Sequence, residues 1–272
     1  MPEPELPIAR VVVDVPLAHL DRPFDYAVTA DQDADAVPGA RVRVRFSGRL
    51  RDGFVLERRA TSDHVGKLSP LHKVVSAEPV LTPEIAGLIR SVADHYAGTF
   101  ADVLRLAVPP RHAATEQIEP RPGPPGLPED PPPGPLVGYP TGAGYLQALR
   151  YGGRPRAMWQ VTPSATPSGD WAAGLASAAR ACAESDRGAV IVVPDQRDLE
   201  RLTQACTAVL GSAGFAVLVA EAGPAARYRA FLAAQRGEVR VVIGNRAAAY
   251  APVERLGLVA LFDDGDDLLS EP

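Results

Sequence analysis

The sequence predicts a multidomain α/β protein with a small β-rich N-terminal domain, a helical segment, a proline-rich linker and a parallel α/β lobe. Three observations support this prediction. Residues 39–46 alternate apolar side chains with arginines, residues 109–140 contain 12 prolines, and continuous apolar stretches alternate with helix-like stretches from residue 141 onwards. A length of 272 residues fits about two domains.

Short strands form the N-terminal domain. The apolar segment IARVVVDVPL (8–17) predicts the first strand. In GARVRVRF (39–46) the period of two predicts a strand with one apolar face and one face of guanidinium groups. We expect RDGFVLERR (51–59) to be its hairpin partner, with Asp52-Gly53 at the head, and KLSPLHKVV (67–75) to form another short strand.

A helical segment follows in residues 82–109. Thr82 is a suitable N-cap, Pro83 suits the first turn, and Glu84 adds a favourable charge there. Gly98 divides the segment into two helices. The N-terminal domain is therefore expected to be a set of short strands followed by two helices.

A proline-rich stretch separates this domain from the rest of the chain. Proline fixes φ and removes a backbone donor, so residues 109–140 are expected to form neither sheet nor helix. We interpret 111–140 as a semi-extended linker. A proline-rich ligand for a partner protein is the alternative that the composition leaves open.

The remaining residues, 141–272, alternate strands with helices. The strands are AVIVVP (189–194), FAVLV (215–219), VRVVIG (239–244) and LGLVALFDD (256–264). Continuous apolar strands between helices predict a parallel sheet that is covered on both faces. Because an open sheet of this type usually has further strands, we expect the 272 residues to be the N-terminal part of a longer protein.

Charge is distributed unevenly along the chain. The net charge is −5, yet residues 41–73 hold nine basic and three acidic residues, a difference of +6. Arg41, Arg43 and Arg45 share one strand face, where like charges repel, and this pattern predicts contact with a phosphate backbone. A solvated strand face is the alternative. The acidic residues near the C-terminus would repel nucleic acid unless a metal lay among them.

Targeting and redox signals are weak. The N-terminus lacks a basic region followed by an apolar one, so we expect no signal peptide. No apolar run approaches the ~20 residues of a membrane span. Cys182 and Cys206 form no CxxC pair and predict two buried thiols in a reducing cytosol. We therefore expect a cytoplasmic protein with no membrane partner.

Several segments together resemble the primosomal protein N′ (PriA) family of replication restart factors. They are RPFDYAV (22–28), GARVRVRF, LHKVVSAEPVLTPE (71–84), VADHYAGTFADVLRLAVPP (92–110) and GEVRVVIGNRAAAYAPVERLGLVALFDD (237–264). The chain is most similar to the actinobacterial branch. The resemblance is strong over 7–110 and 236–264 and weak over 112–188. It implies a 3′-DNA-end-binding domain at 1–110, a linker at 111–140 and a RecA-like, P-loop-type helicase lobe at 141–272.

The resemblance implies a pocket for the 3′ end of a nascent DNA strand at a stalled fork. A carboxylate there would accept a hydrogen bond from a free 3′-hydroxyl and repel a phosphate, and aromatic rings beside it would stack on the terminal base. The alternative is that the aromatic residues belong to the core and flank an aspartate in a turn. Ser47 is an alternative for the pocket glycine. The implied pocket residues are Phe24, Asp25, Tyr26, Gly48 and Lys73.

The implied phosphate loop departs from the family pattern. The family has GVTGSGKT, whereas this chain has QVTPSATPSGDW (160–171) between the expected first strand and first helix of the lobe. Thr162 is kept and Gly169 is the one glycine, but two prolines remove amide donors and no lysine follows Lys73. Asp170 lies near the lysine position and would repel phosphate.

The second nucleotide motif is also altered. The family's DEEH is replaced by Asp263 and Asp264 followed by glycine. Asp263 could still hold magnesium, and Asp264 is a shortened substitute for the catalytic glutamate. Family members read GTRSA where this chain reads GNRAA, so the resemblance implies backbone contact by Arg246, with an ordinary loop arginine as the alternative.

These observations predict a DNA-binding replication restart factor that recognises the nascent 3′ end and supports primosome assembly without helicase activity. The alternatives are an ATP-dependent 3′-to-5′ helicase with divergent motifs and a primosome scaffold. The family uses ATP with Mg²⁺ and zinc, and the sequence supports neither cofactor. Expected partners are forked or single-stranded DNA and other primosome proteins, with single-stranded DNA-binding protein as a further candidate.

Overall fold

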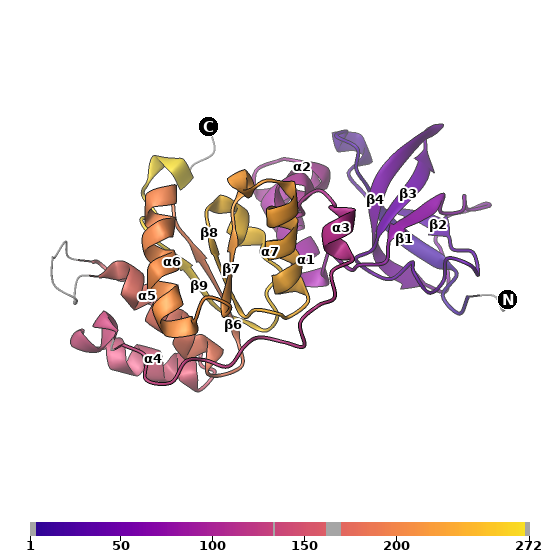
Figure 1. Ribbon diagram of the computed structural model, residues 1–272. Coiled ribbons are helices and arrows are strands. Elements are labelled where there is room, and N and C mark those ends of the chain that lie inside the picture. The colour runs from indigo at the N-terminus through magenta and orange to yellow at the C-terminus, as the bar shows by residue number, and fades with distance from the viewer. Residues whose placement is uncertain (1–3, 133, 162–169, 270–272) are drawn as a thin grey trace. The chain divides into compact units, whose positions relative to one another are not determined.

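The computed structural model describes residues 4–132, 134–161 and 170–269 (Figure 1). The chain divides into two compact units, Met1–Val108 and Pro109–Pro272. The first unit contains an antiparallel sheet and the second a parallel sheet. The predicted α/β class with two kinds of sheet is therefore confirmed.

The sheet of the first unit curls into a barrel. Its strands are β1 (Ile8–Val13), β2 (Phe24–Ala27), β3 (Arg41–Phe46), β4 (Arg49–Arg59) and β5 (Lys73–Ser76), in the antiparallel order β2-β1-β4-β3-β5. The segment before β5 reaches β2, because the Ala27 amide donates to the Ser69 carbonyl and the Leu71 amide donates to the Ala27 carbonyl, both at 2.9 Å. The two edges of the sheet are thereby joined around one apolar core.

The turn between β3 and β4 lies earlier than expected. Ser47 and Gly48 form it, with φ of 47° and 76°, and two positive φ values suit the twist of a two-residue hairpin turn. Asp52 and Gly53 lie inside β4, opposite Arg43 and Val42. The position of Gly53 has a separate cause, since a Cβ there would lie 2.6 Å from the Val12 carbonyl oxygen of β1.

Two helices complete the first unit, as predicted. In α1 (Pro83–His95) the Thr82 hydroxyl accepts from the Ile85 amide at the N-terminus. In α2 (Phe100–Ala107) Thr99 and Asp102 form a capping box, which satisfies backbone donors that the first turn leaves unpaired. Residues 96–99 connect the two helices without being helical themselves, and Ala97 among them has a φ of 54°.

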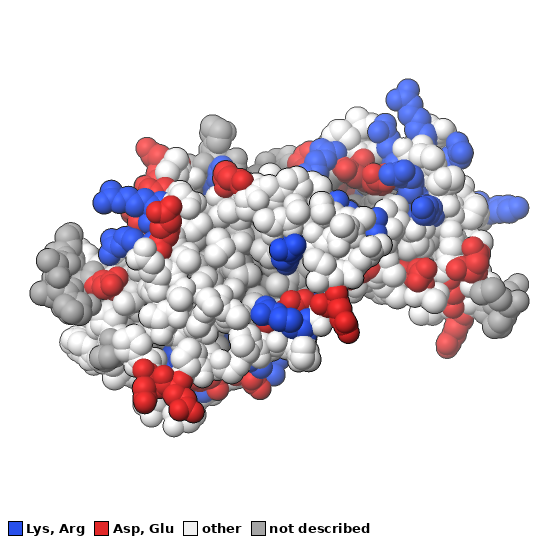
Figure 2. Space-filling view, in the orientation of Figure 1, with Lys and Arg blue, Asp and Glu red and all other residues white. Residues whose placement is uncertain are grey.

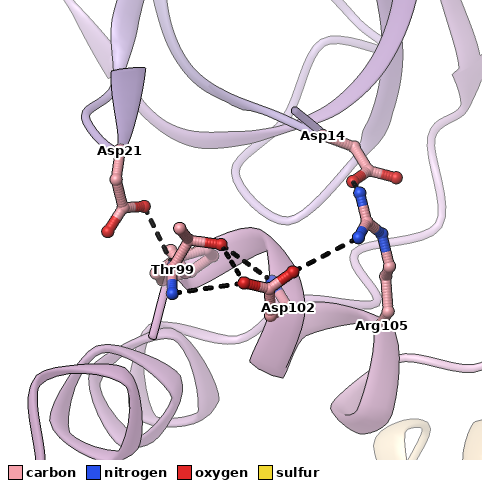
Figure 3. A network of polar contacts seen from close by, with 6 residues as sticks. Asp14, Asp21, Thr99, Asp102 and Arg105 are labelled. Carbon is pink, nitrogen blue, oxygen red and sulfur yellow. Dashed lines mark hydrogen bonds and ion pairs between the residues drawn. The ribbon is translucent and has the colours of Figure 1, made fainter. Parts of the chain in front are cut away.

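Carboxylates attach the helices to the strands (Figure 3). Asp21, just before β2, accepts from the Phe100 amide of α2 at 2.9 Å and from Arg90 of α1 at 2.7 Å. Asp14, just after β1, pairs with Arg105 at 2.6 Å, and Arg105 also contacts Asp102 at 3.4 Å. Charged groups on loops beside the barrel therefore set the positions of both helices.

The second unit is built on four parallel strands in the order β7-β8-β6-β9. They are β6 (Gly188–Val192), β7 (Phe215–Leu218), β8 (Val241–Gly244) and β9 (Leu256–Leu261). Helices α5 (Trp171–Ala183) and α6 (Gln196–Leu210) lie on one side of the sheet and α7 (Pro224–Gln235) on the other (Figure 1), as predicted, and α4 (Gly142–Arg150) packs on α5. Cys182 and Cys206 are both buried and free.

Two expectations for this unit are wrong. The proline-rich stretch contains a short helix, α3 (Ala113–Glu116), because residues 111–119 are free of proline. The stretch also packs on the unit: Arg236 donates to the carbonyls of Glu116 and Ile118 at 2.8 and 2.9 Å. In addition, residues 154–161 form no strand, although the resemblance implies that the first strand of the lobe comes just before the phosphate loop. The Trp159 ring packs instead on α5, over Gly174, where a Cβ would lie 2.2 Å from the ring.

We expect Asp21→Ala to loosen the helices of the first unit. The substitution removes a helix-capping acceptor and a partly buried ion pair, together worth about 2 kcal/mol. In the full chain, amide hydrogen exchange in α2 should accelerate by roughly tenfold or more, in keeping with that free energy. Asp31→Ala, at an exposed turn position, is the matched control, and unchanged exchange in the Asp21 variant would contradict the assigned role.

Candidate nucleic-acid interface

Strand β3 separates its apolar and basic side chains onto opposite faces. Val42 and Val44 are fully buried in the barrel core, so the pleat directs Arg41, Arg43 and Arg45 outward. On the neighbouring strand, Lys73 is the register partner of Arg43. We call these four residues the arginine ridge. Figure 2 shows lysine and arginine side chains gathered over the part of the first unit that carries β3 and β4.

Neighbours hold the ridge side chains in place. The Arg43 Nε lies 2.7 Å from an oxygen of Asp52, and this hydrogen bond raises the pKa of Arg43. The Arg41 guanidinium lies over the Phe54 ring at 4.8 Å, and Arg45 donates to the Gly48 carbonyl at 3.3 Å. The ridge thus brings three guanidinium groups and one ammonium group together on two neighbouring strands.

The same alternation divides the predicted aromatic pair from the predicted carboxylate. Phe24 and Tyr26 point into the barrel, whereas Asp25 points outward. Tyr26 is only 4% exposed, and burial raises its pKa to about 12. Phe24 is half-buried, packs edge-on against Phe46 at 4.8 Å and lies under Arg22 at 4.9 Å. Only Phe24 therefore lies close enough to the surface for stacking on a base.

Asp25 is covered although it lies on the outer face. Its side chain is 11% exposed. One carboxylate oxygen accepts from the Ser62 hydroxyl at 2.5 Å, and the other lies 3.9 Å from the Arg10 Nε. Arg10 lies on β1 directly opposite Asp25 of β2, and it also pairs with Glu57 of β4 at 3.4 Å. Asp25 therefore lies in a strand rather than a turn, among polar partners.

The structure thus places the five predicted pocket residues at several positions on the barrel. Phe24 lies against Phe46, which directly precedes the Ser47–Gly48 turn. Lys73 belongs to the arginine ridge and Tyr26 to the core. Arg10 and Ser62, which contact Asp25, were missed. The sequence could have indicated Arg10, because it is the one charged residue in the apolar segment IARVVV.

In the second unit, a carboxylate occupies the N-terminus of α5. Asp170 accepts from the amides of Ala172 and Ala173 at 3.1 and 3.2 Å, so it fills the position where helix amides attract anions. Trp171 stacks on Phe262 at 3.6 Å, and Arg201 lies over Trp171 and 3.7 Å from Asp170. Thr162 and Gly169 lie outside the described residues.

The remaining predicted residues follow the carboxyl ends of parallel strands. Asp263 and Asp264 are exposed just after β9, and Asp263 has a φ of 50°. The pKa of Asp198 is raised mainly by burial, next by the charge of Asp195, and to a smaller extent by that of Asp263. Within the described ranges, no group of three His, Cys, Asp or Glu side chains could hold a metal ion. Arg246 begins a short 3-10 helix after β8, which Asn245 caps.

Comparison with known proteins identifies the first unit. Residues 10–109 match the family described as the 3′DNA-binding domain (3′BD). This match covers the barrel and both helices. Among the described residues, none of the helices combines the length and the apolar character that a bilayer crossing would need.

Longer relatives match nearly the whole chain. A probable replication restart protein PriA of Mycobacterium tuberculosis (strain CDC 1551 / Oshkosh) is 51% identical over 93% of this chain and 38% of its own length. That of Mycobacterium leprae is 48% identical over 93% of this chain and 39% of its own. The replication restart protein PriA of Bacillus subtilis is 36% identical over 32% of this chain. The chain thus spans less than half the length of these relatives.

Proposed function

Because the chain belongs to the PriA family of replication restart proteins, we propose that its first unit recognises the 3′ end of a nascent DNA strand at a stalled fork and supports primosome assembly. One observation carries this proposal: the 3′DNA-binding domain match covers the unit that carries both the arginine ridge and Asp25. Forked or single-stranded DNA is therefore the proposed partner. Other primosome proteins and single-stranded DNA-binding protein remain proposed partners.

The arginine ridge is the proposed contact for the DNA backbone. Guanidinium and ammonium groups in a row neutralise successive phosphates without reading sequence. The ridge side chains come from adjacent strands, β3 and β5, so their spacing is set by the sheet. Phe24, half-buried with Phe46 and Arg22 beside it, is the proposed platform for a terminal base.

Asp25 is the proposed reader of the 3′-hydroxyl. A carboxylate only accepts hydrogen bonds, so it favours an end that carries a free hydroxyl. A 3′-phosphate offers little donor capacity and brings negative charge to the same place, where like charges repel. The end preference is thereby assigned to a single side chain, which makes it testable.

We expect the full chain to bind forked DNA with a nascent 3′-hydroxyl at least about tenfold more tightly than the same fork with a 3′-phosphate, since one charge-assisted hydrogen bond is lost and one repulsion gained. In Asp25→Ala the two affinities should converge. Fluorescence anisotropy with labelled forks measures both. Asp31→Ala, also in the first unit, is the control, and equal binding of the two ends by the unaltered chain would refute the assignment.

The double substitution Arg43→Ala and Arg45→Ala should weaken binding to every fork alike. Loss of about two phosphate contacts should also reduce the slope of log affinity against log salt by roughly 2. The ratio between hydroxyl and phosphate ends should stay unchanged, because Asp25 is untouched. Asp52→Ala is the complementary variant: it removes the carboxylate beside Arg43 and should strengthen binding. A changed end ratio in the double variant would argue against separate roles.

We further propose that the second unit is a degenerate RecA-like lobe that neither binds nor hydrolyses ATP. The support comes from the residues present. No lysine follows Lys73, and the Asp170 carboxylate occupies the amides at the start of α5 that a phosphate would need. A bound nucleotide would meet that charge. The only two cysteines, Cys182 and Cys206, are buried in the core of the unit, which does not suit zinc.

The proposal of an inactive lobe predicts no ATP hydrolysis by the full chain, with or without forked DNA. Phosphate release measures hydrolysis, and binding of a fluorescent ATP analogue measures nucleotide affinity. Asp263→Ala should leave both signals at background. DNA-stimulated hydrolysis that disappears in Asp263→Ala would instead support the alternative, a helicase with divergent motifs.

A further inference from the structure

Three charged side chains form a row across the outer face of the barrel. Arg10 of β1 is the register partner of Asp25 on β2 and of Glu57 on β4. Its Nη1 lies 3.4 Å from Glu57, but its Nε lies 3.9 Å from Asp25, beyond hydrogen-bonding distance. The Arg10 Nε is buried, and no hydrogen-bond acceptor for it lies among the described residues. The row is therefore incompletely satisfied at Asp25.

The chain after β4 folds back over this incomplete site. The Ser62 hydroxyl donates to Asp25 at 2.5 Å, at the short end of the range for a hydroxyl on a carboxylate. The hydroxyl is itself oriented, since it accepts from the His64 amide at 3.1 Å. With Ser62 in place, little of the Asp25 side chain meets solvent.

Ser62 and the 3′ end of DNA offer the same chemical group. Both are aliphatic alcohols that can donate one O–H to a carboxylate oxygen. On the basis of the proposed 3′-end recognition, we infer that Ser62 is a specificity-determining residue of the Asp25 site. Its hydroxyl occupies the position of the terminal hydroxyl, and a 3′-hydroxyl end binds by displacing it.

The segment that carries Ser62 is weakly held. All side chains from Asp63 to Lys67 are exposed, with Asp63 at 90% and Val65 at 97%. Its ion pair, Arg59 with Asp63, is 3.6 Å long and at such exposure contributes little. The segment is anchored again at Ser69, whose carbonyl accepts from the Ala27 amide at 2.9 Å, and at Leu71, which is buried. Displacing residues 60–67 therefore breaks few buried contacts.

A 3′-hydroxyl end and a 3′-deoxy end differ in whether they can replace the hydrogen bond between Ser62 and Asp25. A 3′-hydroxyl replaces the hydrogen bond that Ser62 gives up, so the exchange is nearly neutral at Asp25. A 3′-deoxy end has no donor and gains nothing by displacing Ser62, so it binds with the Ser62–Asp25 hydrogen bond in place. Ser62 therefore lowers the affinity for hydroxyl ends, because each must compete with it for the same oxygen.

The test is Ser62→Ala in the full chain, with forks whose nascent strand ends in a 3′-hydroxyl or a 3′-deoxy sugar. Affinity for the hydroxyl fork should rise by roughly three- to tenfold, the size of one net hydrogen bond, and affinity for the deoxy fork should stay the same. Ser62→Thr keeps the hydroxyl and should bind like the unaltered chain. Ser91→Ala, which removes an exposed hydroxyl bonded to the Gly87 carbonyl of α1, is the matched control.

The outcomes separate this inference from the proposed function. If the unaltered chain prefers the hydroxyl end, Asp25→Ala loses that preference and Ser62→Ala changes nothing, the inference is overturned and the proposed function stands. An equal rise for both ends also overturns it. If neither the unaltered chain nor Ser62→Ala distinguishes the ends, both fail. Because the expected result is a gain of affinity, a misfolded variant cannot imitate it.

Discussion

The alternation of side chains across a strand is the constraint on which the first unit depends. A small barrel has one face for its core, so every second residue of β1, β2 and β3 must be apolar. This requirement directs Val42 and Val44 inward and aligns the arginine ridge outside. It also separates Tyr26 from Asp25, one residue apart in sequence. The surface available for DNA is thus formed by the alternate residues whose side chains do not enter the core.

The outer face carries charges in rows, and their partners decide what each can do. On the ridge, Asp52 pairs with Arg43, and three arginines and Lys73 lie together on two neighbouring strands, where they can meet a polyanion. In the other row, Asp25 already holds the Ser62 hydroxyl and lies near Arg10. The ridge can therefore supply affinity without selecting an end, whereas the Asp25 site can select an end at the cost of displacing its own occupant.

In the second unit, the residues that form the scaffold differ from those that we propose have lost contact with nucleotide. Four parallel strands and helices on both faces require only apolar strands and amphipathic helices. The N-terminus of α5 still attracts negative charge, but Asp170 of the same chain supplies it, with Arg201 nearby. Stability and nucleotide chemistry rest on different residues here, so one can persist without the other.

The sequence alone determined the elements whose signals are local. The period of two in β3, the cap at Thr82 and the apolar strands of the second unit all depend on neighbouring residues. Tertiary structure decided what depends on distant ones. Residue 53 must be glycine because β1 passes against it, Trp159 packs on α5 over Gly174, and Ser62 reaches Asp25 across 37 positions. No local pattern encodes such contacts, because folding brings together residues that are far apart in the chain.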